Sequence, residues 1–174
     1  ESRTKKSVNK SAILMNLSRI NRQVKKWPLN KEEFRINNMI IRSGLTAVTY
    51  YRTHDILEKL KILYTKIEKK NAYITLNQGT NEISLIVDNS IYQEVIHVLA
   101  QKPKVVENGL SALGIHFDDR YLRIPGLIYY IIQQITMQNI NIVEISSTNT
   151  ELIIYVHDRD VELAFETIYR QFAR

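Results

Sequence analysis

The chain has 174 residues, of which 44% are hydrophobic and 24% charged, which suits one packed domain or two small ones. It contains no cysteine, so disulfides, thiolate nucleophiles and cysteine metal sites are excluded. No apolar run approaches the roughly 18 residues of a membrane span, and no signal-peptide pattern opens the chain. We therefore expect a cytoplasmic protein with no membrane contact.

The net charge of +6 is concentrated at the N-terminus. Residues 1–26 hold eight basic residues and one acidic residue, so this segment carries +7 and the rest of the chain −1. Apolar residues recur there at three- and four-residue steps and predict a helix over residues 8–25, which Trp27-Pro28 would end. Arg19, Arg22 and Lys26 project from roughly the opposite face. This basic face would either bind nucleic-acid phosphates or lie in solvent on a helix that packs against the rest of the protein.

Residues 31–108 follow the pattern of a small α+β unit. Two strands are predicted on either side of a turn at Ser43-Gly44. An amphipathic helix, a hairpin of two strands and a short helix capped by residues 88–90 come next. The predicted ranges are strands 34–41 and 46–52, helix 54–69, strands 72–76 and 83–87, and helix 91–101.

Residues 109–174 repeat that order. An extended segment over residues 104–117, interrupted by Gly109 and Gly114, leads to a helix in which Pro125 occupies the first turn. The later predictions are strand 140–145, a turn at 146–150, strand 152–156 and helix 160–172, which His157-Asp158 would cap.

Residues 81–87 and 150–156 share an apolar strand pattern about 69 residues apart, so the chain contains an internal repeat. Each copy reads as a ferredoxin-like βαββα unit. Because one copy alone leaves a sheet edge and an apolar face uncovered, we expect the copies to share one antiparallel sheet with helices on one face. The predicted divisions are a basic helical segment at 1–30 and α+β units at 31–108 and 109–174.

One segment resembles the tandem ACT regulatory region of aspartokinases. It carries Pro125-Gly126 at the start of a helix, Asn-Ile-Asn-Ile at 139–142, Ile-Ser-Ser-Thr at 145–148 and a final strand and helix. The resemblance is good over residues 111–172, weaker over 34–105 and absent over 1–30. The kinase domain of that family has no counterpart in the chain, so phosphotransfer is not implied.

The resemblance implies a sensor of small ligands, usually amino acids. The ligand would lie at the loop before the helix, where backbone N–H groups and the positive helix end attract its carboxylate. Asp118 or Asp119 would supply a negative charge. The implied site residues are Asp119, Ile124, Pro125, Gly126, Leu127, Asn141, Val143 and Ile145. The first repeat has Arg52-Thr53-His54-Asp55 in place of Pro-Gly, which argues against a site there.

No other pattern in the chain favours catalysis, a cofactor or a metal. The four histidines are scattered without metal-ligand spacing, and the adjacent Asp118-Asp119 pair suits a solvated loop better than acid–base chemistry. Packing explains most of the ten tyrosines better than base stacking does. The sequence predicts a regulatory homodimer rather than an enzyme. Nucleic-acid binding and a purely structural dimerisation module remain the alternatives.

Overall fold

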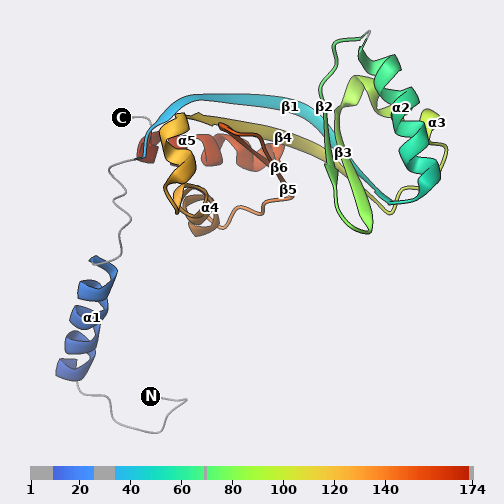
Figure 1. Ribbon diagram of the computed structural model, residues 1–174. Helices are drawn as coiled ribbons and strands as arrows, with labels where there is room; N and C mark the ends of the chain where they lie inside the picture. Colours follow the sequence, from blue (N-terminus) through green and yellow to red (C-terminus); the bar gives the residue numbers. More distant parts are fainter. Residues whose placement is uncertain (1–9, 26–33, 69, 173–174) are drawn as a thin grey trace, which may run out of the picture. The chain divides into compact units, whose positions relative to one another are not determined.

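A computed structural model describes residues 10–25, 34–68 and 70–172, without the side chains of residues 20–25. The chain divides into a first unit, residues 1–33, and a second unit, residues 34–174. The first unit contains helix α1, Lys10–Lys25 (Figure 1). The helix end predicted at Trp27-Pro28 lies outside the described residues.

The second unit is a six-stranded antiparallel sheet with four α-helices, in the strand order β2-β3-β1-β4-β6-β5. Three short 3₁₀ turns connect some of these elements. The strands are β1 (Ile36–Tyr51), β2 (Ile74–Gln78), β3 (Glu82–Asp88), β4 (Val105–Phe117), β5 (Glu144–Ser147) and β6 (Glu151–His157). The helices are α2 (His54–Glu68), α3 (Tyr92–Leu99), α4 (Leu127–Met137) and α5 (Val161–Phe172), and the turns are η2 (Asn89–Ile91), η3 (Asp119–Arg123) and η4 (Asp158–Asp160).

The turn predicted at Ser43-Gly44 is wrong, because β1 is one continuous strand of 16 residues. Gly44 has a φ of 76° and lies where the β1–β4 register shifts, so it forms a bulge rather than a turn. Gly109, with a φ of 68°, forms the corresponding bulge on β4. The two bulges flank the paired residues Leu45 and Leu110. Each bulge bends its strand at the centre of the sheet.

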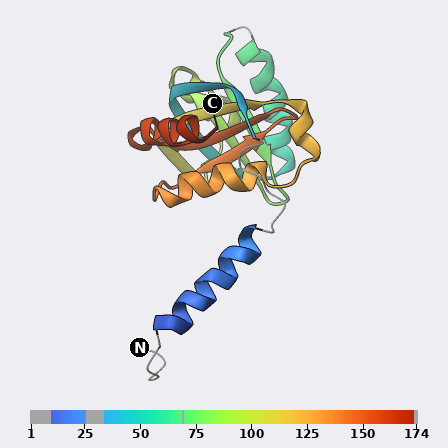
Figure 2. The same ribbon diagram turned by 90° about the vertical axis from the view of Figure 1, so that its left-hand side faces the viewer.

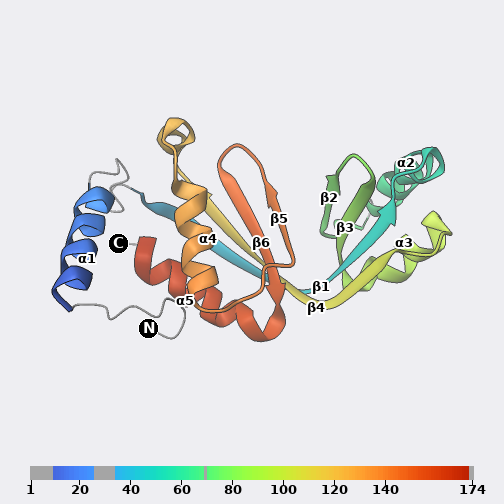
Figure 3. The same cartoon turned by 90° about the horizontal axis from the view of Figure 1, so that it is seen from below.

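The two halves of the sheet share their long strands. On β1, strand β3 pairs with the C-terminal part alone, from Leu45 onward. On β4, strand β6 likewise pairs with the C-terminal part alone, from Leu110 onward. The N-terminal part of β1 pairs with the stretch of β4 that β6 also joins. The N-terminal part of β1 therefore lies in the second half of the sheet, although α2 and α3, which follow β1, belong to the first half. The N-terminal part of β4 likewise lies in the first half, although α4 and α5, which follow β4, belong to the second half (Figure 3).

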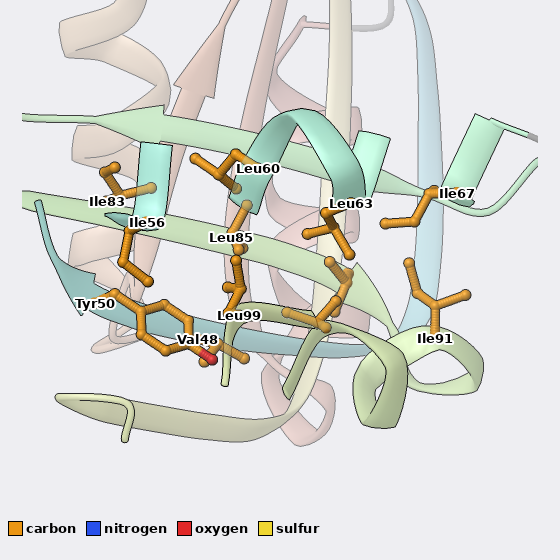
Figure 4. Close-up of a cluster of buried hydrophobic side chains, with 12 residues drawn as sticks. Val48, Tyr50, Ile56, Leu60, Leu63, Ile67, Ile83, Leu85, Ile91 and Leu99 are labelled. Atoms are coloured by element: carbon orange, nitrogen blue, oxygen red, sulfur yellow. The ribbon is translucent and has the colours of Figure 1, made fainter. Parts of the chain in front are cut away.

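Side chains along each strand point alternately to the two faces of the sheet. One face packs on the helices, and the opposite face is called the inner face. The core of the first half joins β1 and β3 to α2 and α3; its buried members include Val48, Tyr50, Ile56, Leu60, Leu63, Ile83, Leu85 and Leu99 (Figure 4). In the second half α4 and α5 pack on each other, and they lie side by side in Figure 2. Each buried aliphatic side chain contributes about 1.5–3 kcal/mol.

The inner face of the sheet carries a second cluster: Leu45, Ala47, Ile86, Leu110, Ala112 and Tyr155. Side chains on this face link the two edge strands, β2 and β5, although the strands do not pair through their backbones. The Asn77 side chain on β2 bonds the Ile145 carbonyl and the Ser146 hydroxyl on β5, at 3.3 and 3.0 Å. The hydroxyls of Tyr73 and Tyr155 lie 2.7 Å apart across the same gap. The prediction of one shared antiparallel sheet is confirmed.

Several predicted elements are confirmed, and the start of one strand is corrected. The helices predicted at 54–69, 91–101, 125–138 and 160–172 are present with ends shifted by a few residues. The strand predicted at 140–145 starts later, at Glu144, because Asn139 has a φ of 59° and the Ile140 N–H bonds the Ile135 carbonyl to end α4.

Both predicted side-chain caps are wrong. Asp88 and His157 make no side-chain bond to the turns that follow them. The Asp88 carboxylate instead accepts a hydrogen bond from the Tyr73 N–H at 2.8 Å. Next to the bulges, Asn89 bonds the Thr46 hydroxyl and Asp158 bonds the Ser111 hydroxyl. The polar residues that were assigned to helix starts therefore stabilise the centre of the sheet.

Candidate functional site

The candidate site lies where β4 ends and α4 begins. After Phe117 the chain forms the short turn η3, and the Asp118 carboxylate accepts a hydrogen bond from the Arg120 N–H at 3.0 Å. Gly126 follows with a φ of 112°, a conformation that favours glycine, and α4 starts at the next residue. The first intrahelical bond of α4 runs from the Tyr130 N–H to the Gly126 carbonyl at 2.9 Å.

A pocket of about 420 Å³ opens at this junction. Its walls combine the η3–α4 loop, the start of α4 and the turn between β5 and β6. The lining residues are Phe117, Tyr121, Leu122, Ile124, Pro125, Gly126, Leu127, Ile128, Tyr129, Ser147, Thr148, Asn149 and Leu152. The volume is in the range of small-molecule sites, and the wall is apolar except for the β5–β6 turn and exposed backbone.

The sheet pairing explains why the β5–β6 turn faces the loop. β6 pairs with the C-terminal part of β4, and the Phe117 N–H bonds the Thr150 carbonyl at 3.0 Å. The turn between β5 and β6 is closed by a bond from the Thr148 N–H to the Glu151 carbonyl. The two walls of the pocket are therefore held by backbone bonds that do not depend on the pocket's own side chains.

The charged groups near the loop are directed elsewhere. Arg120 lies 3.4 Å from the Asp118 carboxylate and stacks over the ring of Tyr121 at 5.2 Å. No acidic or basic side chain is among the lining residues. By helix geometry, the N–H groups of Leu127 and the next two residues have no intrahelical acceptor. The available electrostatic attraction is thus the partial positive charge of the helix start, which favours an anionic group.

Four of the eight residues predicted for this site line the pocket: Ile124, Pro125, Gly126 and Leu127. The other four, Asp119, Asn141, Val143 and Ile145, are not among the lining residues. Val143 donates its N–H to the Tyr155 carbonyl at 2.8 Å, and the Ile145 carbonyl accepts from Asn77. These two residues join β5 to the rest of the sheet.

Sequence reasoning missed the apolar wall and the β5–β6 turn as parts of the site. Phe117, Tyr121 and Leu122 precede the Pro-Gly pair, and their apolar character was the available signal. Ser147, Thr148 and Asn149 were identified only as a turn. The internal repeat could have located this turn, because the repeat pairs β6 with β4. That pairing brings the start of β6, and the turn before it, to the end of β4.

The corresponding loop of the first half has a different structure. The Thr53 hydroxyl accepts a hydrogen bond from the Ile56 N–H at 3.2 Å, so a side chain of the chain itself caps α2. The Asp55 carboxylate pairs with Lys59 at 2.8 Å, and this contact holds the pKa of Asp55 below its usual value. The start of α2 therefore already carries an acceptor and an anion, in contrast to the start of α4.

Two further features were sought among the described residues. No group of three or more histidine, aspartate or glutamate side chains is arranged to hold a metal ion in the described ranges. None of the helices in the described part of the chain is both long and apolar enough to cross a membrane. On α1 the Arg19 side chain is exposed. The Arg22 side chain and Lys26 lie outside the described parts.

Comparison with known proteins gives a match in structure alone. No family model matches the sequence, and no curated protein does. The aspartate kinase of Clostridium acetobutylicum is similar with a TM-score of 0.66 and 16% identity over 79% of this chain and 35% of the enzyme. The ligand-free regulatory subunit of Thermus thermophilus aspartate kinase is similar with a TM-score of 0.65 and 11% identity, over 80% of this chain and 99% of the subunit.

Escherichia coli aspartokinase III in complex with aspartate and ADP is also similar, with a TM-score of 0.62 and 15% identity over 79% of this chain and 34% of the enzyme. The chain thus spans about a third of the length of the two complete enzymes and nearly all of the regulatory subunit. At these identities the likeness is one of fold. The chain therefore has the ACT-type fold of aspartate kinase regulatory subunits, as its sequence motifs predict.

Proposed function

We propose that this protein is a cytoplasmic regulatory sensor rather than an enzyme, and that it binds a small amino acid in the pocket at the start of α4. The observation that supports this most directly is the 420 Å³ pocket itself, which combines an apolar wall with an open helix N-terminus. The similarity to regulatory subunits of aspartate kinase is consistent with such a role.

In the proposed complex the ligand carboxylate accepts hydrogen bonds from the first N–H groups of α4. The ammonium group faces the Ser147–Asn149 turn, whose hydroxyl and amide oxygens are acceptors among the lining residues. The proposal also includes Asp119 as the negative group and Asn141, Val143 and Ile145 as contacts. Because these four residues do not line the pocket of this chain, they would have to come from a second chain.

We further propose that the sensor is a homodimer whose arrangement responds to the ligand. α4 exposes Ile128, Tyr129 and Met137, which are 48%, 56% and 72% accessible, on the helix that opens the pocket. A ligand at the start of α4 would therefore lie beside an apolar surface that a second copy can cover. The division of the second unit at residue 108 into two ACT units belongs to the same proposal.

The test is thermal unfolding of the chain in the presence of each of the twenty amino acids. A ligand at 100 times its Kd should add about 2.7 kcal/mol, which for a chain of this size raises Tm by roughly 5–10 °C. Gly126→Ala should abolish the response to the amino acid that binds in this pocket, because Gly126 has a φ of 112° and lies in the pocket. Gly109→Ala is the matched control, since Gly109 also has a positive φ but lies outside the pocket.

Both glycine variants should lose stability, and only Gly126→Ala should lose the ligand response. A response that survives in Gly126→Ala would move the ligand to another site. The absence of any responder among the twenty would contradict the sensor proposal and leave a structural dimerisation module.

Nucleic-acid binding is the second candidate function, and the observation that favours it is α1. This helix has four basic residues and no acidic residue over Lys10–Lys25. Fluorescence anisotropy with duplex DNA should show binding that weakens steeply with salt and is lost when Arg19 and Arg22 become alanine. Arg170→Ala removes an exposed charge from α5 and is the control. Equal binding by both variants would reject this candidate.

A further inference from the structure

A second and smaller pocket, of about 160 Å³, lies on the inner face of the sheet. Its walls come from β1, β4, β6 and the residue that precedes β2, so it is separate from the pocket at α4. We call it the inner hollow. It holds roughly five times the ~30 Å³ that one water molecule occupies in the liquid. It therefore suits a ligand of only a few heavy atoms.

The inner hollow exists because β4 carries two small residues in succession on this face. Ala112 pairs with Arg42 and Gly114 pairs with Ile40 on β1, so all four point to the same side of the sheet. A Cβ atom at Gly114 would lie 3.4 Å from Glu151 Oε1. The carboxylate of Glu151 thus borders the space that the missing side chain leaves open.

Charges of opposite sign face this space. The Arg42 guanidinium lies over the Tyr73 ring, 5.0 Å from its centroid, and its nearest anion is Asp88 at 3.7 Å, which is longer than a hydrogen bond. Within the described ranges the guanidinium makes no hydrogen bond, although it has five N–H donors. Among the described residues the Glu151 carboxylate has one ionisable side chain beside it, His116, whose Nε2 lies 3.3 Å away.

We propose that the inner hollow binds a small zwitterion, with its carboxylate on Arg42 and its ammonium group on Glu151. A guanidinium pairs with a carboxylate through two parallel N–H donors, and the contact with the Tyr73 ring holds the Arg42 guanidinium beside the hollow. The Glu151 carboxylate supplies the opposite charge on the β6 side. A free amino acid with a short side chain matches both the charges and the volume.

The occupant would also lie next to Tyr73, whose hydroxyl joins the side-chain contacts across the inner face. Tyr73 lines the inner hollow, and its hydroxyl lies 2.7 Å from the Tyr155 hydroxyl on β6. The Thr75 hydroxyl lies within 3.0 Å of both tyrosine oxygens. A zwitterion between Arg42 and Glu151 therefore connects β1 to β6 next to these bonds, and should stabilise them.

The test is isothermal titration calorimetry of the full chain with glycine, alanine and serine as probes. Acetate and ethylamine each carry one of the two charges and should bind at least roughly tenfold more weakly than alanine. Arg42→Gln and Glu151→Gln should each weaken alanine binding by roughly tenfold or more. Arg170→Gln, which removes an exposed arginine on α5, should leave the affinity unchanged.

Gly114→Val is a second kind of variant, because it fills the inner hollow and leaves both charges in place. It should abolish binding of all three probes. Gly126→Ala, which alters the other pocket, should leave binding in the inner hollow intact, so the two sites can fail independently. The proposal is overturned if no probe binds, if acetate equals alanine, or if Arg42→Gln retains the wild-type affinity.

Discussion

At the scale of single residues, two buried tyrosines show how much a hydroxyl depends on its surroundings. Tyr50 and Tyr155 are both fully buried, with 1% and 0% of their surface accessible. Among the described residues the Tyr50 hydroxyl has no hydrogen-bond partner, whereas the Tyr155 hydroxyl bonds Tyr73 and Thr75. Because an unpaired buried polar group costs free energy and a paired one does not, the same substitution should have opposite effects at the two positions.

Tyr50→Phe should increase the free energy of unfolding by about 1 kcal/mol at neutral pH, because it removes an unpaired hydroxyl and keeps the ring. Urea denaturation measures this change. Tyr51→Phe, at the exposed neighbouring position, should change stability by less than about 0.5 kcal/mol. A loss of stability in Tyr50→Phe would show that the hydroxyl has a partner, such as a buried water.

The same residue predicts a pH dependence. Burial, with a smaller contribution from Tyr92, raises the pKa of Tyr50 from 10.0 to about 12. The unfolded chain therefore loses the Tyr50 proton at a lower pH than the folded chain does, and unfolding becomes easier as the pH rises from 10 toward 12. Tyr50→Phe should reduce this alkaline loss of stability in urea titrations at pH 9 and pH 11. An unchanged pH dependence would contradict the assignment.

Tyr155→Phe should destabilise the protein by about 1–3 kcal/mol, because it leaves the hydroxyls of Tyr73 and Thr75 with one partner fewer in a buried setting. Urea denaturation of Tyr73→Phe and of the double variant would complete a double-mutant cycle. The loss in the double variant should be smaller than the sum of the two single losses. Strict additivity would show that the two hydroxyls act independently.

At the scale of elements, the bulges on β1 and β4 determine how the sheet bends. Gly44→Ala and Gly109→Ala should each cost about 1–2 kcal/mol, because both glycines have a left-handed backbone that a Cβ disfavours. Thermal or urea unfolding would show this loss. Gly79→Ala is the control, since a Cβ there would meet only the Glu82 carbonyl at an ordinary 3.6 Å. A similar loss of stability in all three variants would mean that the reduced backbone flexibility of alanine, rather than the bulge conformation, causes the loss.

Local patterns predicted the elements that have strong periodicity, and failed where the outcome depends on pairing. α2 and α5 were located because their buried residues recur every three or four positions. Ser43-Gly44 reads equally as a turn or as a bulge, and only pairing with β4 decides between them. The caps failed for the same reason, since Asn89 and Asp158 bond residues on distant strands.

The candidate site was predictable in part. The Pro125-Gly126 pair marks the start of a helix in the sequence itself, so the loop could be identified. The inner hollow could not, because Arg42 and Glu151 lie far apart in the chain and line the same space only when β1, β4 and β6 are placed side by side. A single strand pattern does not reveal which residues will share a face with those of another strand.

At the scale of the whole molecule, the exchange of strand segments means that neither half is complete alone. Cutting the chain after Gln101, in the connection between α3 and β4, leaves each fragment with an unpaired length of β1 or β4. Circular dichroism should show that residues 34–101 and 102–174 are poorly folded separately and regain the native spectrum when mixed at equal concentration. A fragment that folds alone as a monomer would contradict this interdependence.

The length of β4 has a mechanical consequence. Its 13 residues follow a path of about 40 Å, from the first half of the sheet at Val105, through the bend at Gly109, to the pocket at Phe117, with no loop between. A rotation of β4 by about 5° around one end would move the other end by about 3–4 Å over that length. β4 thus connects the pocket mechanically to the first half of the sheet. A ligand that tilts the C-terminal end of β4 would displace α3 and the elements around α3, while the contacts among those elements stay unchanged.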